Sequence, residues 1–154
     1  MGTGYFTQPS LCADRIVFVC EDDLWEVDSS GGQARRLTNS RSEIKTPYLD
    51  PSGKWIACCA KEEGDPDVYL MSADGGPLTR LTWLNSVTRI VGWTPDGSSI
   101  LFHSIHQAVH HRGSDAWLFK VGVDGGPVQR LPFGPAVSLN CLLYTSDAAD
   151  DSLR

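Results

Sequence analysis

Apolar residues occur along this chain in short runs that turn residues separate. Two of these runs, residues 16–20 and 55–59, are apolar at consecutive positions. A strand with one face in water alternates apolar and polar side chains, so these runs predict strands that are buried on both faces. Gly and Pro recur at many of the breaks between these short runs, so the pattern predicts an all-β protein.

Three copies of one sequence pattern follow each other. Each copy has Asp, then an aromatic residue two positions later, then a Gly-Gly pair and an Arg-Leu pair. The copies cover residues 23–38, 67–82 and 115–132. Their Gly-Gly pairs end at residues 32, 76 and 126, which gives steps of 76 − 32 = 44 and 126 − 76 = 50 residues. This alignment matches Trp117 with Trp25 and Tyr69, and an insertion between Ile105 and Ser114 explains the longer second step.

Each copy is predicted to contain four strands, which in the second copy cover residues 45–49, 54–60, 67–73 and 78–82. The Pro-Ser-Gly and Pro-Asp-Gly sequences at 51–53 and 95–97 suit tight turns, because Pro fixes one φ angle and Gly accepts a positive φ. A repeat of four strands and about 40–45 residues is typical of a β-propeller blade, which neighbouring blades bury on both faces. A two-sheet sandwich is the alternative, but it does not predict a recurring signature.

The sequence therefore predicts an incomplete β-propeller with about three four-stranded antiparallel blades, at approximately 1–40, 41–84 and 85–134. Propellers close with about four to eight blades. We expect this arc to leave apolar terminal faces exposed and to be marginally stable alone.

Composition and charge exclude several classes of function. The chain has 154 residues, is 41% hydrophobic and 21% charged, and carries a formal net charge of −6. Nucleic-acid binding needs clustered Lys and Arg, which this chain lacks. A membrane-spanning helix needs about 20 apolar residues, and no run approaches that length. The N-terminal sequence lacks the regions of a signal peptide, so we expect a cytoplasmic location.

The cysteines are predicted to be structural. They form no CxxC pair, and four of them lie in or beside apolar runs, where Cys behaves as a small hydrophobic residue. The five positions are Cys12, Cys20, Cys58, Cys59 and Cys141.

The repeat pattern stops after Asn140. Residues 141–150 correspond to the translation of DNA that resembles a sequencing-library adapter. We expect residues 141–154 to be a disordered, non-biological tail on a gene fragment, and a natural acidic C-terminal segment is the alternative. On the first interpretation Cys141 has no function.

The WD40-like repeats resemble those of the TolB protein and of tricorn-type proteases. Three longer strings distinguish these two families: residues 14–25, 80–97 and 130–138 are similar to the N-terminal six-bladed propeller of the tricorn type. The resemblance covers residues 4–140. It implies a cytoplasmic serine peptidase that degrades oligopeptides downstream of the proteasome, and a fragment that serves as a gating and channel scaffold.

The same resemblance implies partners. They are peptides that pass through the propeller channel, the remaining domains of the same chain, which include a second propeller, a PDZ-like module and catalytic subdomains, and further copies in a homo-hexamer. No nucleic acid, membrane or cofactor is implied. The catalytic residues of the family lie downstream, so no catalytic, cofactor-binding or metal-binding residue is predicted here.

Three clusters are candidate sites. His103, His106, His110 and His111 could bind zinc, but no Cys or carboxylate completes a ligand set, which favours an exposed loop. Ser104 beside these histidines lacks the Gly-x-Ser-x-Gly motif of a nucleophile. The acidic stretch 61–67 lacks calcium-loop spacing and suggests a solvated hairpin loop.

Two other functions remain open. The chain could belong to a non-enzymatic TolB-like scaffold for protein–protein interaction, or to the propeller cap of a prolyl-oligopeptidase-like enzyme. The sequence downstream of residue 140 distinguishes all three.

Overall fold

The structure is a computed structural model that describes residues 5–39, 42–62, 64–106, 116–136 and 138–139. These residues contain twelve strands and no helix. The strands form three four-stranded antiparallel sheets, in which strands that are adjacent in sequence pair with each other. The first sheet consists of β1 (Phe6–Cys12), β2 (Arg15–Cys20), β3 (Asp23–Asp28) and β4 (Arg35–Arg36). The second consists of β5 (Glu43–Leu49), β6 (Trp55–Lys61), β7 (Asp67–Ser72) and β8 (Thr79–Arg80). The third consists of β9 (Thr88–Trp93), β10 (Ser99–Ser104), β11 (Trp117–Gly122) and β12 (Gly125–Arg130).

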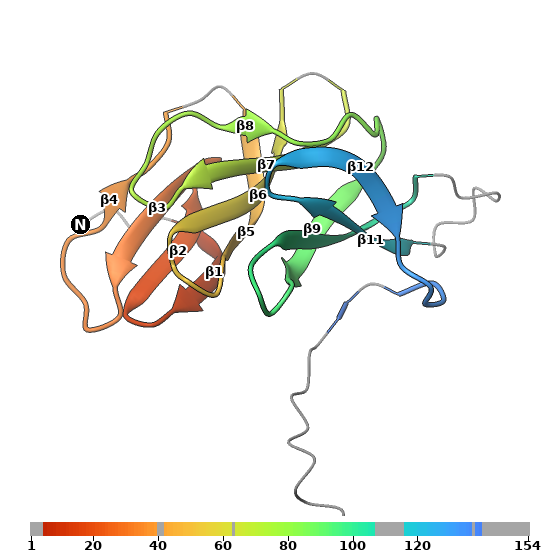
Figure 1. The fold of residues 1–154 in the computed structure, drawn as a ribbon. Coiled ribbons are helices and arrows are strands. Elements are labelled where there is room, and N and C mark those ends of the chain that lie inside the picture. The colour runs from red at the N-terminus through yellow and green to blue at the C-terminus, as the bar shows by residue number, and fades with distance from the viewer. Residues whose placement is uncertain (1–4, 40–41, 63, 107–115, 137, 140–154) are drawn as a thin grey trace, which may run out of the picture.

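The sheets follow one another side by side (Figure 1). The first strands of successive sheets lie together, because β1 contacts β5 and β5 contacts β9. These three strands therefore form the inner edge of the arc, and β4, β8 and β12 form its outer edge. This arrangement confirms the predicted partial β-propeller, with three four-stranded antiparallel blades.

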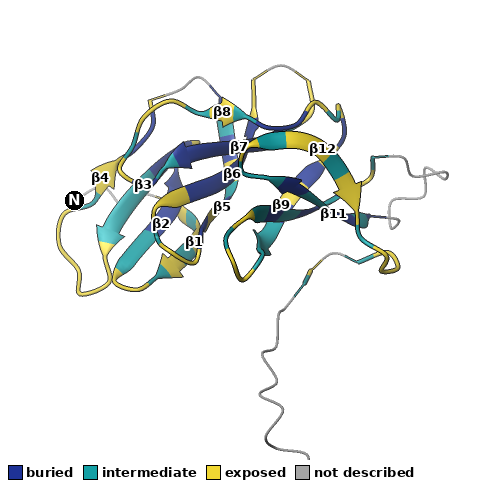
Figure 2. Cartoon of the chain, viewed as in Figure 1, coloured by how far each residue is buried: buried dark blue, intermediate teal, exposed yellow. Residues whose placement is uncertain are grey.

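The second sheet is buried on both faces. Ile56 and Cys58 belong to a cluster shared with the first sheet, whereas Ala57 and Cys59 belong to a cluster shared with the third. All four residues are at most 1% exposed. In Figure 2 most of β6 and β7 is accordingly dark blue. Because consecutive residues of a strand point to opposite faces, consecutive apolar residues are what a strand between two sheets requires.

A hydrogen-bond network explains the recurring Asp and Arg-Leu-Thr residues. In the second sheet the carboxylate of Asp67 forms an ion pair with Arg80 and accepts a hydrogen bond of 2.8 Å from Oγ1 of Thr82. The backbone N–H of Val68 donates to the same Thr82 hydroxyl at 3.0 Å. Asp23, Arg36 and Thr38 repeat these contacts in the first sheet; the Thr38 hydroxyl donates to Asp23 at 2.6 Å. The signature thus joins the third and fourth strands of a blade.

The third sheet departs from this network and corrects the alignment. In the second sheet Asp67 is paired with Ala60 at the start of the third strand. In the third sheet the equivalent pair is Trp117 with Ser104, so Trp117 occupies the position of Asp67. The position of Trp25 and Tyr69 is therefore taken by Phe119, not by Trp117 as the sequence alignment predicted. The guanidinium of Arg130 lies 3.3 Å from the centre of the Trp117 ring, so a cation–π contact replaces the ion pair. Asp115 lies outside the described residues.

The turns between the first two strands of each later blade are held by carboxylates. Asp50 accepts hydrogen bonds from the backbone N–H groups of Ser52, Lys54 and Trp55 at 2.7–3.1 Å. In the third sheet Asp96 accepts bonds from Oγ1 of Thr94 at 2.6 Å and from the backbone N–H of Ser98 at 3.0 Å. These bonds favour the ionised form and lower the pKa of Asp96 to about 2, the hydroxyl of Thr94 being the largest cause.

This lowered pKa predicts an acid-sensitive contribution to stability. In the unfolded chain Asp96 has the ordinary aspartate pKa of 3.8, whereas in the folded chain its pKa is about 2. The ionised carboxylate therefore stabilises the folded chain above pH 3.8, and this contribution is lost as the pH falls toward about 2. Urea unfolding at about pH 5 and at about pH 2.5 should show a smaller pH difference for Asp96→Ala than for the unsubstituted chain. Equal pH differences for the two chains would contradict this role of Asp96.

Two further observations concern membrane spans and the C-terminal end. Among the described residues, none belongs to a helix that is long and apolar enough to cross a membrane. The segment 141–154, interpreted as a translated adapter, lies outside the described residues.

Candidate functional site

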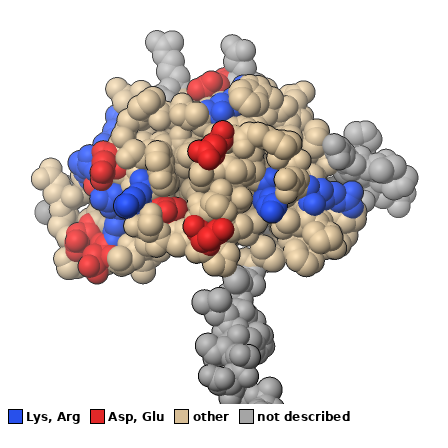
Figure 3. Space-filling view, in the orientation of Figure 1, with Lys and Arg blue, Asp and Glu red and all other residues tan. Residues whose placement is uncertain are grey.

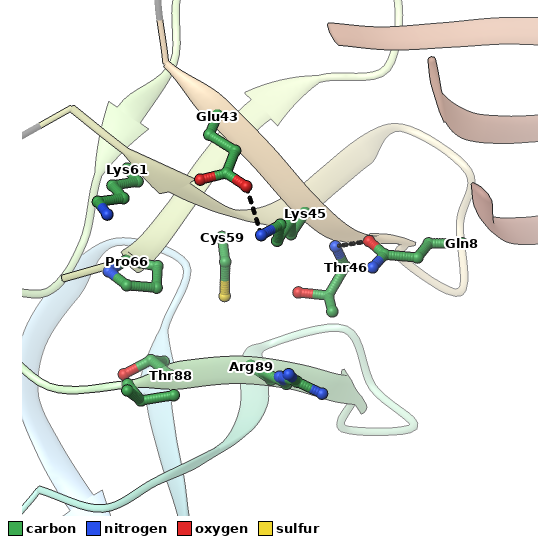
Figure 4. A pocket seen from close by; sticks show the side chains of 10 residues that line it. Gln8, Glu43, Lys45, Thr46, Cys59, Lys61, Pro66, Thr88 and Arg89 are labelled. Carbon is green, nitrogen blue, oxygen red and sulfur yellow. Dashed lines mark hydrogen bonds and ion pairs between the residues drawn. The ribbon is translucent and has the colours of Figure 1, made fainter. Parts of the chain in front are cut away.

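A cavity of about 350 Å³ lies where the inner edges of the three sheets meet. Side chains from β1, β5, β6 and β9 line it, together with residues of the two loops beside them (Figure 4). The lining residues are Gln8, Glu43, Lys45, Thr46, Cys59, Lys61, Pro66, Val87, Thr88 and Arg89.

The charges of the cavity are mostly positive, with three cations and one carboxylate. Lys45 forms an ion pair with Glu43, and a hydrogen bond from Lys45, followed by its charge, lowers the pKa of Glu43. Both side chains are well exposed, so the pair adds little stability. In the described part of the chain, Lys61 and Arg89 have no ion-pair partner. The cavity can therefore accept an anionic group such as a carboxylate.

Bulges in the inner strands shape the wall of the cavity. Gln8 and Thr46 have φ angles of 54° and 46°, and the strand register shifts beside each of them. The backbone N–H of Thr46 donates to Oε1 of Gln8 at 2.6 Å (Figure 4). The N–H of Ile90 in turn donates to Oγ1 of Thr46 at 3.3 Å. Each bulge residue thus holds the inner strand of the next blade.

Cys59 lies in the cavity but is not suited to nucleophilic chemistry. Burial, the largest cause, raises its pKa to about 11, although a hydrogen bond with Thr46 acts in the opposite direction. Because the thiolate is the reactive form, Cys59 is a neutral thiol at about pH 7. Cys20, Cys58 and Cys59 are buried and Cys12 is half-buried, and all four are free, as expected for small hydrophobic residues. Cys141 lies outside the described residues.

The structure describes Ser104 and two histidines of the candidate cluster, His103 and His106. Ser104 is fully buried and shares hydrogen bonds with Oγ1 of Thr88 at 3.2 Å and Oγ of Ser86 at 3.4 Å, so no free hydroxyl is available for attack. The His106 ring packs on Phe119 with their centres 6.2 Å apart. Within the described ranges no group of His, Cys, Asp and Glu could hold a metal.

His103 lies on β10, and burial, followed by the charge of Arg89, lowers its pKa. His110 and His111 lie outside the described residues, so the exposed loop assigned to them stays a prediction. The acidic stretch 61–67 was expected to be a solvated hairpin loop. Its last residue, Asp67, is instead 1% exposed and belongs to the hydrogen-bond network of the second sheet.

The cavity residues were not identified from the sequence as a site. Lys45, Lys61 and Arg89 come from three different strands, and only the packing of the second and third blades brings them together. Positive charge elsewhere on the visible face is scattered among acidic residues (Figure 3). A local signal exists only for the wall, where Gln8-Pro9 and Thr46-Pro47 recur at the bulges.

The chain is part of a β-propeller. Its four-stranded sheets pack face to face in sequence order, and their first strands meet at an inner edge beside the cavity. Residues 3–149 match the tricorn protease N-terminal β-propeller domain. The chain belongs to this family.

Known proteins support the assignment. Tricorn protease homolog 1 of Streptomyces coelicolor is 33% identical over 132 residues, which cover 85% of this chain and 12% of that protein. The tricorn protease of Thermoplasma acidophilum is 29% identical over 141 residues, which cover 85% of this chain and 13% of that protein. The chain therefore spans about one eighth of the length of these relatives.

Solved structures share the fold. A crystal structure of the tricorn protease superposes with a TM-score of 0.79 at 26% identity, covering 90% of this chain and 14% of that one. A TolB structure from Agrobacterium tumefaciens has a TM-score of 0.71 at 21% identity, over 85% of this chain and 47% of that chain, which shows a shared fold only.

Proposed function

We propose that this chain forms part of the channel wall of a tricorn-type peptidase and binds the carboxylates of peptides without cleaving them. The observation that carries the proposal is the cation-lined cavity at the inner edge of the arc, which residues from all three sheets surround. In this proposal the chain is a non-catalytic gating scaffold. Catalysis takes place in other domains of a longer protein, as the greater length of the relatives suggests. The cytoplasmic peptidase and the homo-hexamer belong to the same proposal.

The chemistry of the cavity supports peptides as its ligands. A free peptide C-terminus carries a carboxylate, which charge-assisted hydrogen bonds from Arg89 and Lys61 can bind. Thr46 adds a hydroxyl group that can donate to the same anion. The location favours a ligand in the channel because β1, β5 and β9 form the inner edge.

Binding of a labelled peptide with a free C-terminus should weaken about tenfold in Arg89→Gln, since one charge-assisted hydrogen bond is lost. Fluorescence anisotropy of the 154-residue chain measures this. Lys54→Gln is the matched control, because Lys54 is an exposed cation in the turn between β5 and β6, at the opposite end of those strands from Glu43 and Lys61. Equal binding of the peptide and its C-terminal amide, or an unchanged affinity of Arg89→Gln, would contradict the proposal.

The alternative is a non-enzymatic TolB-like scaffold, which the TolB structures favour through their shared fold. The complete gene decides between the two. A second propeller followed by PDZ-like and serine-peptidase regions supports the peptidase, whereas a stop codon after six blades supports the scaffold.

A further inference from the structure

Three aromatic residues lie at one end of the boundary between the second and third sheets, and Tyr48, Trp55 and Trp93 are here called the aromatic cluster. Tyr48 is paired with Ala57, so Tyr48 and Trp55 are diagonal neighbours on the face of the second sheet that carries Ala57. Ala57 packs against the third sheet. Trp93 is paired with Ile100 and packs against the same hydrophobic cluster as Ala57. Its Nε1–H group donates to the backbone carbonyl of Tyr48 at 2.9 Å, so the aromatic cluster lies on the facing surfaces of two neighbouring blades.

The aromatic cluster is open to solvent, and blade packing does not require it. Tyr48 is 36% exposed and Trp55 is 44% exposed, whereas Trp93 is half-buried. At the boundary between the first and second sheets, the strand register places at the equivalent positions Ser10, Arg15 and Leu49. Two blades therefore pack without an aromatic residue at any of these positions. Partly exposed aromatic rings gathered at one place are typical of a surface that binds a ligand.

The strands that carry the aromatic cluster also carry the cations of the cavity, at their other ends. Each strand contributes one cation and one aromatic residue: β5 carries Lys45 and Tyr48, β6 carries Lys61 and Trp55, and β9 carries Arg89 and Trp93. A strand rises about 3.3 Å per residue, so the four steps from Arg89 to Trp93 span about 13 Å. The cation-lined cavity and the aromatic cluster thus lie about 13 Å apart along the inner edge of the arc.

We propose that the aromatic cluster is a second subsite for the peptide and takes an apolar side chain about four residues before the C-terminal carboxylate. An extended peptide advances about 3.3–3.6 Å per residue, so a carboxylate in the cavity places the side chain four residues earlier beside the cluster. Aromatic rings bind such a side chain by removing apolar surface from water. The inference rests on the proposed function and adds a ligand class to it, namely peptides that are apolar near their C-terminus.

The backbone of β5 between the two subsites is already bonded to neighbouring blades. The N–H of Thr46 donates to the side chain of Gln8. The N–H of Leu49 donates to Oγ of Ser10 at 3.1 Å, and the carbonyl of Tyr48 accepts the bond from the indole described above. A peptide therefore cannot pair with β5 as an added strand at these positions. Recognition of the peptide depends on side chains at the two ends of the strand.

The place of the aromatic cluster favours a peptide as its occupant over another part of a longer chain. Further blades of a propeller would pack on the outer faces of the first and third sheets, whereas the cluster faces the boundary between the second and third. Tyr48 and Trp93 belong to β5 and β9, which are inner strands that a ligand in the channel contacts.

Fluorescence anisotropy of the 154-residue chain with a matched pair of labelled peptides tests the proposal. Both peptides have a free C-terminus and differ only at the position four residues before the last, which is leucine in one and serine in the other. The leucine peptide should bind about tenfold more tightly, and moving the leucine next to the last residue should abolish this gain. The comparison uses the unsubstituted chain and is decisive whether or not a variant folds.

Two tryptophan variants test the cluster itself. Trp55→Ser should reduce the difference between the leucine and serine peptides to less than about twofold, because it removes an exposed ring of the subsite. Trp83→Ser is the matched control and should keep the tenfold difference, because Trp83 is also exposed but lies in the segment after the outer strand β8. Circular dichroism checks that both variants keep their β structure.

The carboxylate dependence separates this inference from the proposed function. Arg89→Gln should weaken both peptides by the same factor and keep their ratio, since it changes only the subsite for the carboxylate. Equal affinities of the leucine and serine peptides, with the C-terminal amide still binding more weakly, would overturn the second subsite and leave the proposed function standing. An equal effect of Trp55→Ser and Trp83→Ser on the ratio would also overturn it. If neither carboxylate peptide binds, both proposals are wrong.

Discussion

Replacing Asp67 with alanine is expected to lower the free energy of unfolding by about 3 kcal/mol. Asp67 is 1% exposed, and its carboxylate binds the guanidinium of Arg80, the hydroxyl of Thr82 and the backbone N–H of Leu84, the last at 2.9 Å. The substitution leaves all three donors without this acceptor, and all three lie on β8 or in the segment that follows it. Urea unfolding followed by circular dichroism measures the loss.

Asp74→Ala provides the matched control for this experiment. Its side chain is 84% exposed and pairs with Arg15 at 3.2 Å on the surface. An exposed ion pair contributes little, so the control should change stability by less than about 0.5 kcal/mol. Similar losses for the two variants would show that the Asp–Arg–Thr signature does not hold the blade together.

Replacing Phe102 with alanine should cost about 3–5 kcal/mol, because it creates a cavity between the second and third sheets. Phe102 is fully buried and stacks on Phe119 with the ring centres 5.7 Å apart. Leu101→Ala should cost less than half as much, because Leu101 is half-buried on the face of β10 that points away from the second sheet. Equal costs would contradict an arc whose third sheet is covered on one face.

The fold could be predicted from the sequence because its signals are local. Consecutive apolar residues at 55–59 indicate burial on both faces, and Gly75 and Gly76 adopt the positive φ angles that their turn requires. The fourth strands were predicted less well: β8 is limited to Thr79–Arg80, whereas residues 78–82 were expected. Leu81 and Thr82 beyond it are held by the N–H bond to Val68 and by Asp67 instead of by a continued ladder.

The misplacement of Trp117 had a signal in the sequence. Trp117 lies 124 − 117 = 7 residues before Asp124, just as Asp67 lies 74 − 67 = 7 residues before Asp74. The sequence alignment followed residue types instead of this spacing, because Asp115-Ala116-Trp117 has the Asp-x-aromatic pattern of the other two copies. The register shows that spacing from the Gly-Gly turn fixes the position, since the hairpin sets the pairing of the strands.

The cavity could not be predicted in the same way. Its cations are isolated in the sequence, and their approach depends on how the second blade packs against the third. The bulges at Gln8 and Thr46 depend on φ angles that non-glycine residues rarely adopt, and the proline that follows each of these residues is their one local signal in the sequence.

Native-state labelling of Cys58 and Cys59 tests most directly whether blades flank the second sheet on both sides. The two thiols are adjacent, face opposite clusters and are 0% and 1% exposed. Burial raises the pKa of both, and Cys12, which is half-buried, serves as the internal reference. We expect both thiols to be alkylated at least about a hundredfold more slowly than Cys12 and to become reactive together at the urea midpoint of unfolding. Labelling of either one at the rate of Cys12 in the native chain would contradict the flanked-blade architecture.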